Sequence, residues 1–118
     1  MTHEQFRNNI DFIRGSSLDI LLKRNANYAK GSEDALHNFK VGAAMDGSTP
    51  AEAAWGYMVK HLVALRDKVK NNDFSDMTDL VEKCTDIINY TAIIFVIGVE
   101  EATLQNEHSG EVTDNASR

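Results

Sequence analysis

The sequence predicts an all-α protein, bundle-like, with four helices, three of them long and one short. Apolar residues recur at steps of three and four along most of the chain, and only one proline and seven glycines interrupt its 118 residues. Strands and hairpins need more frequent turn residues, so this pattern favours long helices joined by short loops. We expect residues 1–105 to form a single domain and the polar, aperiodic stretch 106–118 to be a disordered tail.

A first helix is predicted over residues 5–29, where Thr2 and Gln5 have the spacing of a capping box. Its stripe recurs at three- and four-residue steps and contains Phe6, Ile10, Ile13, Ser17, Ile20 and Arg24. Gly15 and the two serines after it leave two alternatives open. The segment is either one continuous helix or two helices that meet at a kink.

A short helix is predicted over residues 33–44, with Ser32 as its N-cap and Phe39 on its buried face. A third helix is predicted over residues 50–70, because Thr49 and Glu52 have capping-box spacing around a proline at the first helical position. The expected buried stripe of this third helix contains Trp55, Met58, Val59, Leu62, Leu65 and Val69. Residues 71–73 then break the helix.

The last helix is expected to start after a cap at Ser75 or Asp76 and to run to about Leu104. An apolar stripe on its first half contains Met77, Leu80, Val81, Cys84, Ile87, Ile88 and Thr91. The opposite side carries a polar column of Asp79, Glu82, Asp86 and Asn89. Residues 92–99 are almost entirely apolar on every side and must be enclosed by protein, so we expect a homo-oligomer, either a dimer or a tetramer.

Composition excludes several classes of function. The formal net charge is −6, which argues against direct nucleic-acid binding or an anionic membrane surface, since clustered Lys and Arg supply that affinity. Cys84 is the only cysteine, which excludes a disulfide framework and favours a cytoplasmic location. The start of the chain lacks the pattern of a signal peptide, and the apolar run is too short for a bilayer, so no membrane segment is expected.

The polar column is the first candidate site. Glu82 and Asp86 are four residues apart and can both reach one cation, and Asp34 from the short helix can add a third oxygen. A hard ion such as Mg²⁺ takes one or two carboxylates plus waters and substrate phosphates, so these three residues are the predicted metal ligands. A solvated helix face is the alternative that the sequence leaves open.

Further polar residues are candidates for handling a substrate. Lys60 is expected to act as the catalytic cation by neutralising phosphate charge, or else to pair with Asp86. Asn38, His61 and Asn89 are the candidate substrate-binding residues. Asn38 can hydrogen-bond a base or sugar, and Asn89 extends the column toward the buried end of its helix, where a polar group needs a partner. The alternative is that Asn38 is a surface residue and His61 a packed one.

Three stretches, taken in order and spacing, carry a resemblance to known proteins. They are residues 34–39 after Tyr28, residues 49–52 leading to Lys60 and His61, and residues 82–90. Over about residues 22–101 the chain resembles small phage- and prophage-encoded helical proteins, which are distantly similar to the all-α nucleoside triphosphate pyrophosphatases, or MazG-like group.

This resemblance implies an oligomeric helical bundle in the host cytoplasm. It also implies Mg²⁺ held by carboxylates on facing helices, and hydrolysis of a (deoxy)nucleoside triphosphate to monophosphate and pyrophosphate. The chain departs from the group's motifs, since Glu82 and Asp86 have one residue more between them than E-x-x-D, and E-x-x-E has no counterpart. Two functions therefore stay open: a MazG-like nucleotide-binding protein, with or without Mg²⁺-dependent hydrolysis, and a non-enzymatic phage interaction or regulatory protein on the same scaffold.

Overall fold

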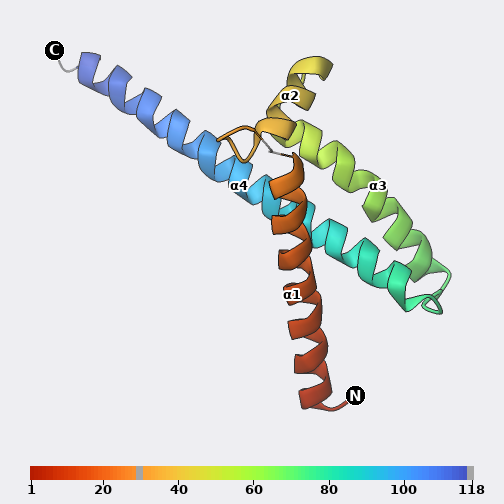
Figure 1. Cartoon of the computed structure of the whole chain (residues 1–118). Coiled ribbons are helices and arrows are strands. Elements are labelled where there is room, and N and C mark those ends of the chain that lie inside the picture. The colour runs from red at the N-terminus through yellow and green to blue at the C-terminus, as the bar shows by residue number, and fades with distance from the viewer. Residues whose placement is uncertain (29–30, 117–118) are drawn as a thin grey trace.

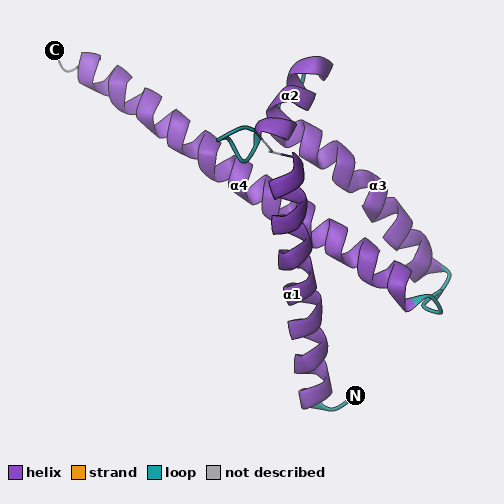
Figure 2. Ribbon diagram, in the orientation of Figure 1, coloured by secondary structure: helices purple, strands orange, loops and turns teal. Residues whose placement is uncertain are grey.

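The computed structural model describes residues 1–28 and 31–116, with side chains described for 1–27 and 31–107. Every regular element in this part is an α-helix (Figure 2). The elements are α1 (His3–Tyr28), α2 (His37–Asp46), α3 (Pro50–Lys70) and α4 (Met77–Ala116). The predicted all-α class, with three long helices and one short one, is confirmed.

The helices form an open arrangement around α4 (Figure 1). α3 turns back at its end and packs along the first half of α4, which is the most extensive contact between elements. α1 crosses α4 near the middle of α4, and the N-terminal end of α1 extends away from the other helices. α2 lies against α3. The 40 residues of α4 span about 60 Å at 1.5 Å per residue and account for most of the 64 Å length of the molecule.

The predicted helix starts are largely confirmed. At α3, the Thr49 hydroxyl accepts a hydrogen bond from the Glu52 backbone N–H at 3.2 Å, and the Glu52 carboxylate accepts one from the Thr49 N–H at 3.3 Å. At α4, Asp76 is the residue that caps, since its carboxylate accepts from the Asp79 N–H at 3.1 Å. α1 is continuous through Gly15, which settles the alternative that the sequence left open.

The predicted start of the short helix is wrong, because α2 begins at His37 rather than Glu33. The Ser32 hydroxyl accepts from the Asp34 N–H at 3.1 Å, and the Asp34 carboxylate accepts from the Leu36 N–H at 2.9 Å. These local bonds compete with helix formation and hold the segment in turns. Gly47 caps the C-terminal end of α2, and its φ of +68° lies in the left-handed region that favours glycine.

The last helix continues beyond the predicted end near Leu104, since α4 reaches Ala116. The disorder expected for 106–118 stays a prediction, because the side chains after residue 107 and all of residues 117–118 lie outside the described part. The assignment of residues 1–105 to a single domain also stays a prediction. α4 also contains a 31-residue segment, Met77–Glu107, that is long and apolar enough to cross a membrane by length and composition alone. Core helices of soluble proteins also pass that test, so it assigns no location.

A small apolar core joins the loop before α2 to α3 and α4. Leu36, Ala54 and Ile97 are its buried residues, and the partly buried residues packed against them are Phe39, Ala51, Ile93 and Ile94. The predicted stripe of α3 is confirmed at Met58, which is 7% exposed, and wrong at Trp55 and Val69. Ala54 is fully buried, while Trp55 remains 55% exposed. The small side chain at position 54 allows α3 to pack closely against Leu36 and Ile97 in this core.

The polar column of α4 faces inward over part of its length. Thr85, Asp86 and Asn89 are buried, whereas Ile88 on the expected core stripe is 38% exposed. Glu82, one turn earlier than Asp86, is exposed, as expected of a solvated face. The alternative of a solvated face therefore does not hold for Asp86 and Asn89, which lie buried where α1 and α3 pack on the polar side of α4.

Candidate functional site

A cavity of about 290 Å³ lies where α1, α2, α3 and α4 converge. Its lining is contributed by all four helices: Leu21, Arg24, Asn25, Asn38, Phe39, Tyr57, Asp86, Asn89, Tyr90 and Ile93. The cavity forms because α1 crosses α4 at an angle (Figure 1), so that the end of α1 stands over the α4 turn that carries Asp86 and Asn89. Residues distant in the sequence therefore share one hollow.

Asp86 is the charged centre of this site. Its side chain is 8% exposed, and one carboxylate oxygen accepts a hydrogen bond from Arg24 Nη1 at 2.9 Å. The other oxygen lies 3.4 Å from Nδ1 of His61. A buried carboxylate needs such partners, because removing an unpaired charge from water costs several kcal/mol. Asp86 thereby fixes the position of Arg24, whose side chain stays 52% exposed.

Aromatic rings form one wall of the cavity. Tyr57 and Tyr90 are stacked with their centroids 6.1 Å apart, and His61 stacks on Tyr90 at 5.4 Å. Phe39 meets Tyr57 edge to face at 6.4 Å. Rings held by one another in this way present flat apolar surface at low conformational cost, which suits a planar ligand.

Asn89 is the unusual residue of the site. It is only 7% exposed, and its amide nitrogen Nδ2 is buried without a hydrogen-bond partner among the described residues. An unsatisfied buried donor costs about 1–3 kcal/mol, and such groups are rare in folded proteins. Because Asn89 lines the cavity, a ligand that brings an acceptor atom would satisfy this donor.

The structure brings together some of the sequence-predicted site residues and separates others. Asn38, Asp86 and Asn89 line the cavity, and His61 contacts Asp86 from beside it. Lys60 and Glu82 are exposed and do not line the cavity. The predicted pairing of Lys60 with Asp86 is replaced by that of Arg24 with Asp86.

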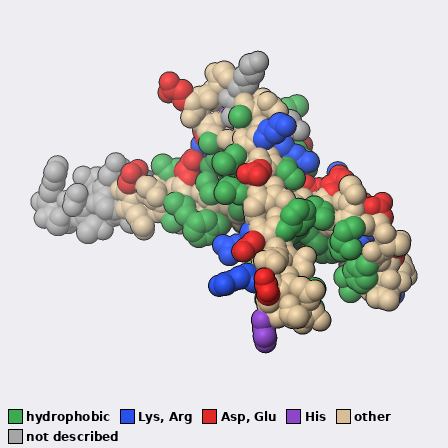
Figure 3. Space-filling model, turned by 60° about the horizontal axis from the view of Figure 1, so that its bottom comes forward, with side chains coloured by type: hydrophobic (Ala, Val, Ile, Leu, Met, Phe, Trp, Pro, Cys, Tyr) green, Lys and Arg blue, Asp and Glu red, His purple; other side chains and the backbone are tan. Residues whose placement is uncertain are grey.

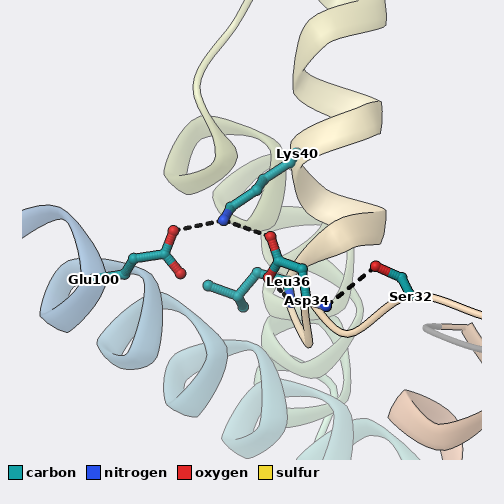
Figure 4. A network of polar contacts seen from close by, with 5 residues as sticks. All are labelled: Ser32, Asp34, Leu36, Lys40 and Glu100. Carbon is teal, nitrogen blue, oxygen red and sulfur yellow. Dashed lines mark hydrogen bonds and ion pairs between the residues drawn. The ribbon is translucent and has the colours of Figure 1, made fainter. Parts of the chain in front are cut away.

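Asp34 belongs to a separate network with Lys40 and Glu100 (Figure 4), and none of these three residues lines the cavity. The ammonium group of Lys40 lies 2.6 Å from the Asp34 carboxylate and 2.5 Å from that of Glu100. The hydrogen bond from Lys40 lowers the pKa of Asp34, and the Leu36 N–H lowers it further. The same two carboxylates raise the pKa of Lys40. This network ties α2 to α4 and does not face the cavity.

A comparable pairing joins the end of α3 to the start of α4. Asp79, the first residue of the predicted column, lies 2.5 Å from the ammonium group of Lys68 and 2.6 Å from that of Lys83. These hydrogen bonds lower the pKa of Asp79. The predicted column thus divides into a structural ion pair, an exposed glutamate and the two cavity residues.

The predicted metal ligands do not meet. Over the part of the chain whose side chains are described, no group of three or more His, Cys, Asp and Glu residues stands close enough to hold an ion. Asp34 is engaged by Lys40, and Asp86 by Arg24. Magnesium binding stays a prediction, and a bound phosphate would have to supply the ligands that these carboxylates do not.

Among the residues that sequence reasoning missed are Arg24 and Tyr90. Arg24 is the only charged residue on the predicted stripe of the first helix, and that conflict is the signal that could have identified it. Tyr90, at the boundary between the two halves of α4, forms the ring surface between Tyr57 and His61. Tyr28, part of the sequence resemblance, has its side chain outside the described part.

Comparisons with known proteins add no relative: no family model, no curated protein and no solved structure matches this chain.

Proposed function

We propose that this protein binds a nucleotide in the four-helix cavity. The single observation that supports the proposal is the Nδ2 of Asn89 at the cavity wall, which is buried and has no hydrogen-bond partner among the described residues. A nucleobase presents ring nitrogens or carbonyl oxygens that accept hydrogen bonds, and its faces stack on aromatic side chains. The cavity offers both requirements beside each other, in the Asn89 amide and the Tyr57–Tyr90 pair.

Arg24 is the group that would hold the charged part of such a ligand. Its guanidinium uses Nη1 to pair with Asp86 and is half exposed, so further N–H groups can turn toward a phosphate. The cavity volume of about 290 Å³ is close to the lower bound of about 300 Å³ for small-molecule sites. It fits a base, with the sugar and phosphates extending toward Arg24.

The finer proposal is a MazG-like hydrolase that uses Mg²⁺ and releases pyrophosphate. The described carboxylates do not fit this role well, since Asp86 is already paired and Glu82 is exposed. We therefore derive no hydrolytic step and treat binding as the function to test first.

The decisive experiment is calorimetric titration of the full chain with ribo- and deoxyribonucleoside mono- and triphosphates, with and without Mg²⁺. Binding of any of them supports the proposal. At a ligand concentration 100 times the Kd, the free energy of unfolding should rise by about 2.7 kcal/mol. Asn89→Leu should abolish binding, because it removes the donor and keeps a similar volume. The matched control is Asn8→Leu on the exposed face of α1.

The same mixtures should be assayed for pyrophosphate. Release that depends on Mg²⁺ and is lost in Asp86→Asn would support the hydrolase, whereas binding without release would leave a nucleotide-binding protein. No binding by any nucleotide would contradict both.

A non-enzymatic interaction protein is the second candidate. It is favoured by the large exposed hydrophobic side chains on α3, among them Trp55 and Val69, which are 55% and 61% exposed. In that case the cavity residues would be structural, and Asn89→Leu would change stability but no ligand affinity.

A further inference from the structure

The chain exposes more surface than a compact monomer of its size. Its accessible surface is 8930 Å², whereas a folded monomer of 13.1 kDa should have about 6,400 Å². The excess is about 2,500 Å². Large homodimer interfaces bury about 2,000–5,000 Å² counted over both chains, so this excess is at the upper end of what one chain buries in such a dimer.

Part of this surface is one apolar face of α4, which we call the outer face, made of Ile88, Phe95, Val96 and Val99. These side chains are 38%, 71%, 48% and 51% exposed. Ile88, Phe95 and Val99 follow each other at steps of seven and four, so they project on the same side of the helix. Hydrophobic side chains are seen gathered near the point where the tail of α4 leaves the body (Figure 3).

The outer face continues a stripe that is already an interface within the chain. Cys84 and Val81, four and seven residues before Ile88, lie on the same side of α4. Together with Phe12 and Ile13 of α1 they line a groove. α1 leaves α4 at the crossing point (Figure 1), so the stripe loses its cover there while its apolar character continues. A second helix is needed to cover it.

We propose that the outer face is covered by the same face of a second copy of this chain, in a two-fold dimer. Such a contact requires a self-complementary patch. Phe95 is a large projecting ring, and Gly98, less than one turn away, is open, because a Cβ placed there meets no atom of the described residues within 4 Å. Phe95 of each chain can therefore pack on Gly98 of the partner subunit.

A lipid bilayer is the competing occupant, and the contacts of α4 argue against it. Asp86 is held by Arg24 of α1, and Glu100 by Lys40 of α2. The 14 residues between these anchors span about 21 Å, which is shorter than the hydrocarbon core of about 30 Å. Crossing a membrane would place at least one of these ion pairs in lipid or break it.

Sedimentation equilibrium of the full chain tests the proposal. The wild type should show a mass twice the 13.1 kDa of one chain. Phe95→Glu should raise the dimer dissociation constant by at least tenfold, because it places a charge in the contact. Met45→Glu, at a position on α2 that is 82% exposed against 71% for Phe95, should leave the dissociation constant unchanged.

Gly98→Leu is a second variant, and misfolding would not explain a weaker dimer in this case. A leucine favours the helix over glycine, so circular dichroism should show helicity kept or increased, yet the side chain fills the hollow and should also weaken the dimer at least tenfold. A wild type that is monomeric at every concentration, or a dimer that both variants leave unchanged, would overturn the proposal. So would a monomer that binds phosphatidylcholine–phosphatidylglycerol vesicles through Phe95.

Discussion

α4 carries two polar clusters about 20 Å apart, and they differ in how completely their groups are paired. In the Asp34–Lys40–Glu100 network, the ammonium group contacts both carboxylates and the side chains are 37–40% exposed. In the cavity, Asp86 is almost fully buried and Asn89 retains a donor without a partner among the described residues. The first cluster is satisfied by the chain itself, whereas the second keeps an amide donor that no described residue satisfies. That difference separates a structural tie from a candidate binding site.

Arg24→Met should give the largest effect. It leaves the buried Asp86 carboxylate with His61 alone, and an uncompensated buried charge is costly, so the free energy of unfolding should fall by about 2 kcal/mol. Urea unfolding followed by circular dichroism measures it. Lys40→Met is the matched control in the exposed network, where solvent screens the charges that remain. Equal shifts in the urea midpoint for both variants would erase the contrast between the clusters.

Asn89→Leu should give the next largest effect, with the opposite sign. Removing an unsatisfied buried donor should raise the free energy of unfolding by about 1 kcal/mol in the absence of ligand. Thr85→Val is the control, since Thr85 is as deeply buried but donates to the Glu82 carbonyl at 2.9 Å. That variant should not be stabilised. If Asn89→Leu is destabilising, the amide has a structural role and the cavity loses its main argument.

Acid should produce the smallest effect, and it should come from the satisfied pairs. The pKa values of Asp34 and Asp79 are lowered from 3.8 by their lysine partners. The folded state therefore binds fewer protons than the unfolded state, and this stabilisation is present above pH 3.8 and lost as pH falls through the lowered pKa values.

Urea midpoints measured from pH 6 down to pH 3 test this linkage. Asp79→Asn should flatten the decline in the acid range, whereas Asp11→Asn on the exposed arm of α1 serves as the matched control. An unchanged profile in Asp79→Asn would show that its pairing with Lys68 and Lys83 does not persist in solution.

Local chemistry alone allowed much of the fold to be predicted. The capping box at Thr49 and the cap at Asp76 depend on residues within one helical turn, so the starts of α3 and α4 follow from the sequence. The start of α2 does not follow from the sequence. The side chains of Ser32 and Asp34 can either cap a helix or hold turns, and only the surrounding contacts select the turns.

The candidate site depended on the tertiary structure. The sequence by itself determined that Asp86 and Asn89 share one side of a long helix and that Asn89, near an apolar segment, needs a partner. Only the crossing of α1 over α4 decided that Arg24, rather than Lys60, meets Asp86, and that Asp34 pairs elsewhere with Lys40. Periodicity shows which residues share a face of a helix, but the angle and register at which two helices pack are set by small residues and pairwise fit, which no single segment contains.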